Sequence, residues 1–159
     1  MPLTLTAFNA ADADDVRPAL TACLAVPRWV DTILEHRPYA SRDALIAAAE
    51  LPLSSDEIRQ AMAAHPRIGE KPKQRGTEGD WSRNEQSGVD NADAFAAANA
   101  EYEAKFGHVY LVCASGRSGE ELLKTLRERL DNDPATELAV AGRELLKIAQ
   151  LRLAKAVTA

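Results

Sequence analysis

Hydrophobic residues recur at helical spacing along most of the chain, as they do in amphipathic helices. Capping residues and prolines interrupt this pattern in the first half of the sequence, which predicts separate short helices. Pro66 disfavours helical backbone at His65, so the last of these helices is expected to end there. The predicted starts before Pro66 are Asn9 or Asp12, Pro27, Ser41 and Ser54.

The second half opens with a predicted loop and then returns to helix. Residues 66–80 contain three glycines and two prolines and have almost no apolar periodicity, which is typical of a loop. Gly107 interrupts the helical pattern once more. Helix starts are predicted at Ser82, where Glu85 completes a capping box, and then at Asp90 or Asn91 and at Ser118. A long last helix is predicted after a turn at Asp131-Asn132-Asp133-Pro134.

A short apolar run, Val109–Ala114, is the one β-rich stretch of the sequence. The chain offers no second strand to pair with it, so a buried extended segment is expected instead of a sheet strand. A chain of 159 residues fits one domain. The pattern therefore predicts an all-α single domain over residues 1–159, a helical bundle of about seven or eight helices with one short buried extended segment.

The charge balance limits the kinds of partner. The chain carries 19 Lys and Arg against 24 Asp and Glu, a formal net charge of −5. A general nucleic-acid binder needs a basic face, so no nucleic-acid partner is expected. A membrane span needs about 18 consecutive apolar residues, and the sequence has no such run. No membrane association is expected.

The N-terminal residues and the cysteines indicate the compartment. The first residues lack a basic region followed by an apolar stretch, so no signal peptide is expected and a cytoplasmic location is predicted. Cys23 and Cys113 lie far apart in the sequence, each within an apolar stretch. Buried, reduced thiols are therefore predicted at both positions.

His65 is the first candidate for chemistry. It is followed by a basic stretch that stands out in an acidic protein and that is able to attract an anionic small molecule. The alternative is a solvated loop with no function. His36, beside Arg37 at a helix end, is interpreted as an exposed or capping residue. The basic stretch contains Arg67, Lys71, Lys73 and Arg75 against the single acid Glu70.

Glu85 and Gln86 are the second candidate. With Ser82 as N-cap, Glu85 has the position that closes a capping box. A helix N-terminus also presents free N–H groups to an anion, and Glu85 and Gln86 add hydrogen-bonding groups beside them. The structural and the functional interpretations are compatible, because Ser82 can cap the helix while Glu85 faces a ligand.

Motifs for phosphate, zinc and nucleophilic-serine chemistry are absent from the sequence. It has no glycine-rich phosphate loop, no zinc-spaced cysteine pairs, no HExxH and no GxSxG. His65 and Glu70 are separated by a proline at a poor spacing for two metal ligands on one helix face. The residues leave two possibilities: an acid/base site without a metal or cofactor, or no active site.

Four motifs occur in order along the chain: His65-Pro66, Ser82-x-x-Glu85-Gln86, Lys105-Phe106-Gly107 and Glu144-x-x-Lys147-Ile148-x-x-x-Arg152-Leu153. The sequence also has Trp29-Val30, Arg37-Pro38, Arg129-Leu130, Asn132 and Glu137. Together, in this order along nearly the whole chain, they resemble the 2-oxo-4-hydroxy-4-carboxy-5-ureidoimidazoline (OHCU) decarboxylase family.

The resemblance implies an all-α, cofactor-independent enzyme, commonly a homodimer. Its expected reaction is the decarboxylation of OHCU, a small anionic ureidoimidazoline, to (S)-allantoin in uric acid catabolism. Carried over by position, His65 and Glu85 are the expected catalytic residues. Substrate-binding roles are expected for Pro66, Arg67, Ser82 and Gln86, and for the segment made of His108, Val109, Tyr110, Leu111 and Val112.

The sequence departs from the family pattern at two places. Arg67-Ile68-Gly69-Glu70 follows His-Pro where many members have Asp-Leu-Ala-Gly, which changes the charge after Pro66. His108-Val109-Tyr110 stands where many members have Phe-Pro-Phe. His108 is therefore either a second acid/base group or a packed substitute for an aromatic residue, and we favour the packed substitute.

Two other functions are compatible with the residues alone. One is a helical interaction module without chemistry, in which the Ala-rich helices form a docking scaffold. The other is a metal-assisted hydrolase of an amide or ureide that uses His65 with Glu70 or Glu85. Metal addition and chelation distinguish the hydrolase from the decarboxylase, and an activity assay distinguishes the decarboxylase from the interaction module.

Overall fold

The structure is a computed structural model that describes residues 2–65 and 92–159. The predicted loop 66–80 and the predicted helix start at Ser82 lie outside these residues. The described residues form eight helices and two short strands, which confirms the all-α prediction. Contacts group the chain into two compact units: unit 1 is Met1–Leu53 with Leu146–Ala159, and unit 2 is Ser54–Leu145. The single-domain assignment of residues 1–159 stays a prediction.

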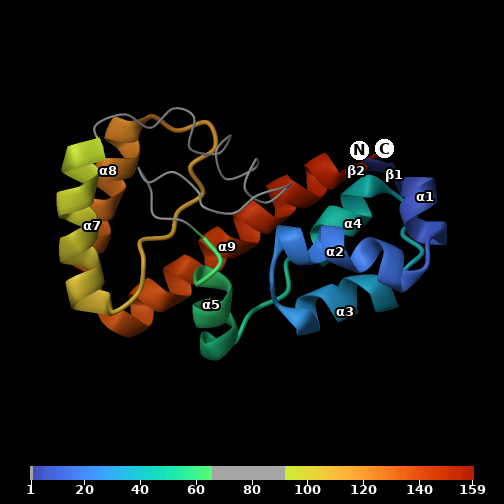
Figure 1. Ribbon diagram of the computed structural model, residues 1–159, viewed down its shortest axis with the longest axis horizontal. Helices are drawn as coiled ribbons and strands as arrows, with labels where there is room; N and C mark the ends of the chain where they lie inside the picture. Colours follow the sequence, from blue (N-terminus) through green and yellow to red (C-terminus); the bar gives the residue numbers. More distant parts are fainter. Residues whose placement is uncertain (1, 66–91) are drawn as a thin grey trace. The chain divides into compact units, whose positions relative to one another are not determined.

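Unit 1 contains four short helices, the C-terminal part of the last helix and a small parallel strand pair. In the pair, Leu3 is in register with Val157, and Figure 1 shows both strands beside the chain ends. This pairing was not predicted, because two-residue strands show no periodicity. The elements are β1 (Leu3–Thr4), α1 (Leu5–Ala10), α2 (Ala13–Cys23), α3 (Pro27–Glu35), α4 (Arg42–Ala48), α9 (Pro134–Ala156) and β2 (Val157–Thr158).

Local signals account for most helix starts in unit 1. The hydroxyl of Ser41 accepts the Ala44 N–H at 3.1 Å and caps α4 as predicted. Pro27 occupies the first turn of α3, where its missing N–H costs nothing. Asp12 precedes α2 but makes no side-chain cap, and the other predicted cap, Asn9, lies inside α1. The predicted helix start at Asp12 is therefore confirmed, although the Asp12 side chain makes no capping hydrogen bond.

Unit 2 contains α5 (Ser55–Met62), α7 (Ala92–Phe106), α8 (Gly119–Arg129) and the first part of α9. The α5 start has the predicted capping box, since Ser54 accepts the Glu57 N–H at 3.2 Å and Glu57 accepts the Ser54 N–H at 2.8 Å. The α7 helix ends as predicted before Gly107, whose φ of +76° favours glycine.

The core of unit 2 lies between α7, α8 and the segment that joins them. Figure 1 shows α7 and α8 side by side, and their contacting faces are apolar. A Cβ atom at Gly142 of α9 would lie 2.7 Å from Cδ1 of Ile58, so glycine permits α5 to approach α9 closely. The core residues are Phe95, Ala98, Tyr102, Tyr110, Val112, Ala114, Leu122 and Leu126.

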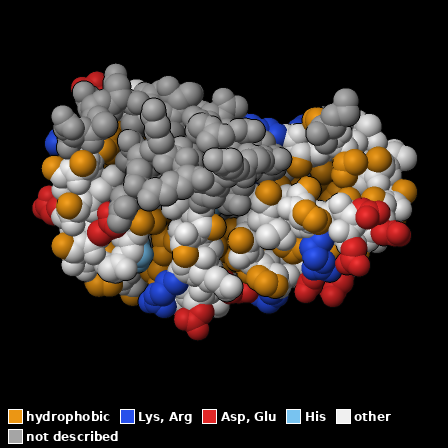
Figure 2. All heavy atoms as spheres, viewed as in Figure 1, with side chains coloured by type: hydrophobic (Ala, Val, Ile, Leu, Met, Phe, Trp, Pro, Cys, Tyr) orange, Lys and Arg blue, Asp and Glu red, His pale blue; other side chains and the backbone are white. Residues whose placement is uncertain are grey.

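Cys23 and Cys113 are not joined in a disulfide, as predicted. Cys23 is buried as predicted, whereas Cys113 is only half-buried, so the prediction of full burial was wrong there. None of the described helices combines the length and the apolar character needed to cross a bilayer. On the face drawn in Figure 2, the Lys and Arg side chains of the described residues lie in small separate groups.

Candidate functional site

The candidate site is built on residues 108–113, here called the linking segment because they join α7 to α8. The segment is neither helical nor paired in a sheet, which agrees with the predicted buried non-strand run. Tyr110, Leu111 and Val112 are at most 3% exposed. Backbone polar groups in such a position need partners from outside the secondary structure.

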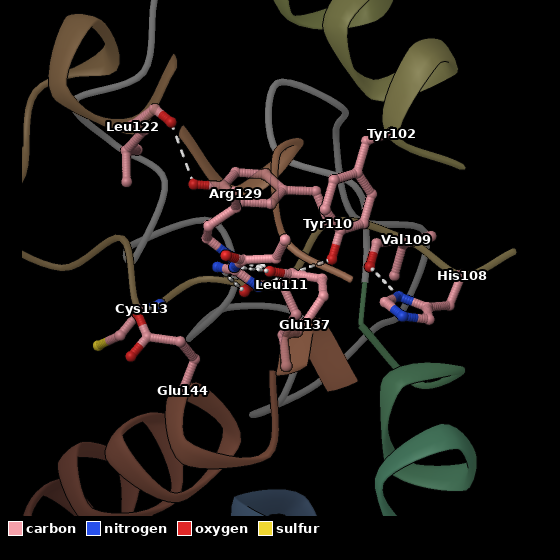
Figure 3. A network of polar contacts seen from close by, with 11 residues as sticks. Tyr102, His108, Val109, Tyr110, Leu111, Cys113, Leu122, Arg129, Glu137 and Glu144 are labelled. Carbon is pink, nitrogen blue, oxygen red and sulfur yellow. Dashed lines mark hydrogen bonds and ion pairs between the residues drawn. The ribbon is translucent and has the colours of Figure 1, made fainter. Parts of the chain in front are cut away.

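Arg129, at the end of α8, supplies one of these partners. Its Nη1 donates to the Leu111 carbonyl oxygen at 2.7 Å (Figure 3). Its Nε donates to both carboxylate oxygens of Glu137, at 3.0 and 2.9 Å, and its Nη2 forms an ion pair with the same carboxylate. Both side chains are buried, so each charge depends on the other for its solvation.

The Glu137 carboxylate is held from two further sides. The Tyr102 hydroxyl of α7 donates to it, and Asn132 Nδ2 donates to it at 3.1 Å. Burial and the hydrogen bond to Glu137 raise the pKa of Tyr102. Burial alone lowers the pKa of Arg129, but the hydrogen bonds and the negative charge of Glu137 outweigh it and raise that pKa. Both groups therefore keep their protons at neutral pH.

Tyr110 and Glu144 restrain the linking segment at two more points. The Tyr110 hydroxyl donates to the Leu122 carbonyl at 3.1 Å, and the Arg129 guanidinium lies 4.8 Å from the centre of the Tyr110 ring. Burial raises the pKa of Tyr110. The buried Glu144 of α9 accepts the Cys113 N–H at 3.3 Å (Figure 3). The segment thus has fixed points on either side of Val112.

Three other backbone donors of the linking segment have no hydrogen-bond acceptor within residues 2–65 and 92–159. Among the residues that the structure describes, none accepts a hydrogen bond from the backbone N–H groups of Tyr110, Leu111 or Val112. Buried N–H groups are almost always paired in proteins, with protein, water or ligand. These three N–H groups are therefore candidate donors to a bound molecule.

His108 packs against aromatic rings. Its ring stacks on Phe106 with a centroid distance of 6.1 Å and meets Tyr102 edge-on at 5.6 Å. Its Nδ1 lies 3.0 Å from the Val109 carbonyl oxygen. These contacts are those of a packed aromatic substitute, the interpretation favoured above.

His65 lies in the same unit as the linking segment, three residues beyond the end of α5. It is half-buried, and its backbone N–H donates to the Met62 carbonyl at 3.1 Å. His36, in contrast, is exposed at the C-terminus of α3, where Nδ1 contacts the Thr32 carbonyl at 2.8 Å. His36 thus agrees with its predicted capping role.

The remaining predicted site residues lie outside the described residues; they are Pro66, Arg67, Ser82, Glu85 and Gln86. The acid Glu70 and the basic residues Lys71, Lys73 and Arg75 also lie outside the described residues. Within residues 2–65 and 92–159, no three His, Cys, Asp or Glu side chains gather as a metal site requires. A metal-assisted hydrolase would use His65 with Glu70 or Glu85. Of these three residues, the structure describes only His65.

Sequence reasoning assigned no role to the Arg129–Glu137 pair. A signal was present, because Arg129 follows Leu122 and Leu126 at helical spacing and so occupies the apolar face of α8. Glu137 likewise shares a face of α9 with Ala141. Charged residues on buried faces require partners, but the sequence does not show which residues provide them.

The described helices hold a buried linking segment whose backbone donors face no acceptor among the described residues, an arrangement typical of proteins that bind a small molecule. The family model for OHCU decarboxylase matches residues 9–154. The chain therefore belongs to the OHCU decarboxylase family, which confirms the family expected from the sequence.

Curated relatives agree with this family. The chain is 36% identical over 129 residues to the 2-oxo-4-hydroxy-4-carboxy-5-ureidoimidazoline decarboxylase of Amia calva, covering 74% of this chain and 73% of that protein. It is 34% identical over 145 residues to the uric acid degradation bifunctional protein TTL of Arabidopsis thaliana, covering 84% of this chain. The match spans only 44% of the length of that bifunctional protein.

Solved structures show the same fold. A crystal structure of OHCU decarboxylase in the presence of (S)-allantoin has a TM-score of 0.70 and 27% identity, over 91% of this chain and 97% of the other. A crystal structure of (S)-allantoin synthase has a TM-score of 0.73 over 99% of this chain and 54% of the other. Its identity is 17%, so it supports the fold alone.

Proposed function

We propose that the protein decarboxylates OHCU and forms (S)-allantoin in uric acid degradation. It is a carboxy-lyase of the OHCU decarboxylase family. The observation that carries the proposal is the linking segment, in which buried backbone N–H groups without acceptors among the described residues suit an anionic, oxygen-rich ligand. Membership of a family whose relatives are named for this substrate supplies the identity of the ligand.

The chemistry needs stabilisation of negative charge and delivery of one proton. The carbon–carbon bond to the carboxylate breaks, carbon dioxide leaves, and the electron pair moves into the adjacent ring C=N bond. The hydroxyl on the same carbon passes its proton to that ring nitrogen, which leaves a negatively charged enolate oxygen. Backbone N–H groups of the linking segment stabilise this developing oxyanion. The His65 imidazole holds a proton and delivers it to one face of the neighbouring, ureido-bearing carbon, so that the enolate becomes the carbonyl of allantoin and a single enantiomer forms.

The other proposed residues bind and orient the substrate. Glu85 accepts hydrogen bonds from the ureido or ring N–H groups and acts beside His65. Pro66, Arg67, Ser82 and Gln86 line the substrate, and His108 with Val109 belongs to the segment that closes over it. A ring with many donors and acceptors needs several fixed polar partners to hold one reactive orientation.

The test is turnover of freshly prepared OHCU, made by enzymatic oxidation of uric acid and hydrolysis of the product. We expect the purified protein to accelerate loss of OHCU above the spontaneous rate and to yield allantoin with the circular dichroism of the S enantiomer. Racemic allantoin at the spontaneous rate would contradict the proposal and favour a helical interaction module.

Replacement of Glu85 by Gln is expected to lower kcat about tenfold or more with little change in Tm. Gln also serves in a capping box, so the substitution preserves helix capping while removing the carboxylate charge. The matched control is Glu57→Gln in the capping box at α5, which is expected to leave kcat unchanged. Equal kcat values for the two variants would restrict Glu85 to a capping role.

Full activity is expected after exhaustive dialysis against EDTA. The sequence has no ligand set at metal-site spacing, and the proposed steps use only residues of the chain. Rates before dialysis, after dialysis and after addition of Zn²⁺ provide the measurement. Activity that is lost with the chelator and restored by the metal would favour the metal-assisted hydrolase.

Assembly, partners and location complete the proposal. We propose a cytoplasmic homodimer of single-domain chains, with a small anionic ureidoimidazoline as substrate and no nucleic-acid or membrane partner. The family resemblance supports the dimer, and the acidic balance of the chain supports the absence of nucleic acid. Light scattering of the purified protein tests the dimer directly.

A further inference from the structure

The Leu111 carbonyl and the Val112 N–H belong to one planar peptide group. In a trans peptide these two groups point in opposite directions, so fixing one fixes the other. Arg129 Nη1 binds the Leu111 carbonyl oxygen at 2.7 Å. The Val112 N–H therefore points away from Arg129, and none of the described residues accepts a hydrogen bond from it.

We propose that Arg129, oriented by Glu137, is a positioning residue that aims the Val112 N–H at the substrate. The inference rests on the proposed function, in which backbone donors of the linking segment stabilise the oxyanion. Arg129 itself does not touch the substrate in this role. It acts through the peptide group between Leu111 and Val112.

The orientation of Arg129 is itself fixed. Its Nε and Nη2 engage the Glu137 carboxylate, and that carboxylate is held by Tyr102 and Asn132. A guanidinium has its donors in a rigid plane, so the binding of Nε and Nη2 to Glu137 leaves Nη1 pointing in one defined direction. The pair is buried, which makes rearrangement toward solvent costly.

The following peptide group is also restrained. Glu144 accepts the Cys113 N–H at 3.3 Å, which fixes the peptide between Val112 and Cys113. Val112 thus lies between two peptide groups that side chains from different helices hold. An N–H group that stabilises an oxyanion must be oriented before the reaction, because the free-energy cost of reorienting it during the reaction would offset the stabilisation of the transition state.

The experiment compares Arg129→Lys with Arg117→Lys. Lysine at 129 keeps a positive charge beside Glu137 but lacks the planar fork needed to hold Glu137 and Leu111 together. Arg117 follows the linking segment and bonds to Thr125 at 2.6 Å, so its replacement is the matched control. Because the oxyanion forms only in the transition state, Arg129→Lys is expected to lower kcat about 10- to 100-fold with a KM change below about threefold.

Hydrogen exchange provides a readout that does not depend on activity. We expect the Val112 and Cys113 amides to exchange at least about tenfold faster in Arg129→Lys than in wild type, since local opening controls such exchange. Arg117→Lys is expected to exchange like wild type. A lower Tm with unchanged kcat and unchanged exchange at these amides would make Arg129 merely structural and overturn the proposal.

Two arrangements keep the test decisive. If Arg129→Lys does not fold, the double variant Arg129→Met with Glu137→Gln replaces it. This variant removes both charges and retains an acceptor for Tyr102. The same fall in kcat and the same faster exchange at Val112 and Cys113 are expected. If wild type does not turn over OHCU, the proposed function fails, and exchange at Val112 and Cys113 still decides whether Arg129 holds the segment. Unchanged exchange there overturns the positioning role.

Discussion

Replacement of His65 by Asn is expected to lower kcat for OHCU by about 10²–10⁴-fold, the usual range for a positioned general acid or base. Asn keeps polarity and approximate size but cannot carry a transferable proton near neutral pH. His65 is half-buried and follows the C-terminus of α5, so the substitution removes no core side chain and Tm is expected to stay near that of wild type.

His36→Asn is the matched control for this prediction. His36 is exposed at the C-terminus of α3, and its Nδ1 lies 2.8 Å from the Thr32 carbonyl oxygen of the same helix. The control is expected to keep wild-type kcat. The measurements are kcat and the circular dichroism of the product. Full, stereospecific turnover by His65→Asn would remove His65 from the mechanism.

Replacement of Glu137 by Ala is expected to lower the free energy of unfolding by about 3–5 kcal/mol, because it leaves a buried charge without its partner. Arg129 is 6% exposed and Glu137 is fully buried, so water cannot replace the lost carboxylate without opening the core. Tyr102 and Asn132 lose an acceptor in the same step.

The control for Glu137→Ala is Glu128→Ala, which removes an exposed carboxylate from α8. Such surface changes usually alter stability by less than about 0.5 kcal/mol. Urea unfolding curves of both variants and wild type give the comparison. Similar losses for the two variants would show that the Arg129–Glu137 pair contributes no more than an exposed charge.

Local sequence signals were sufficient for most elements of the fold. Ser54 with Glu57 predicts the start of α5, Pro27 the start of α3, and Gly107 the end of α7. These signals work because a cap, a proline or a positive φ acts within a few residues of the chain. The apolar run at 109–114 likewise predicted the burial of Tyr110, Leu111, Val112 and Ala114.

Part of the candidate site also followed from the sequence. The order of motifs from His65 to Arg152 identified the family, which the family model confirms. The roles of His65, Glu85 and the other proposed site residues stay predictions. For His108 the neighbouring aromatics Phe106 and Tyr110 were visible in the sequence, but the contact with Tyr102 was not.

Two features were decided only by the tertiary structure. The β1–β2 pair joins the two ends of the chain, and two-residue strands carry no pattern of their own. Arg129, Glu137 and Leu111 meet because α8, α9 and the linking segment pack together. By itself the sequence determined most of the described helices, the absence of the usual metal and phosphate motifs, and the family. The partners of buried charges depend on which helix faces meet, and packing across long sequence separations sets those contacts.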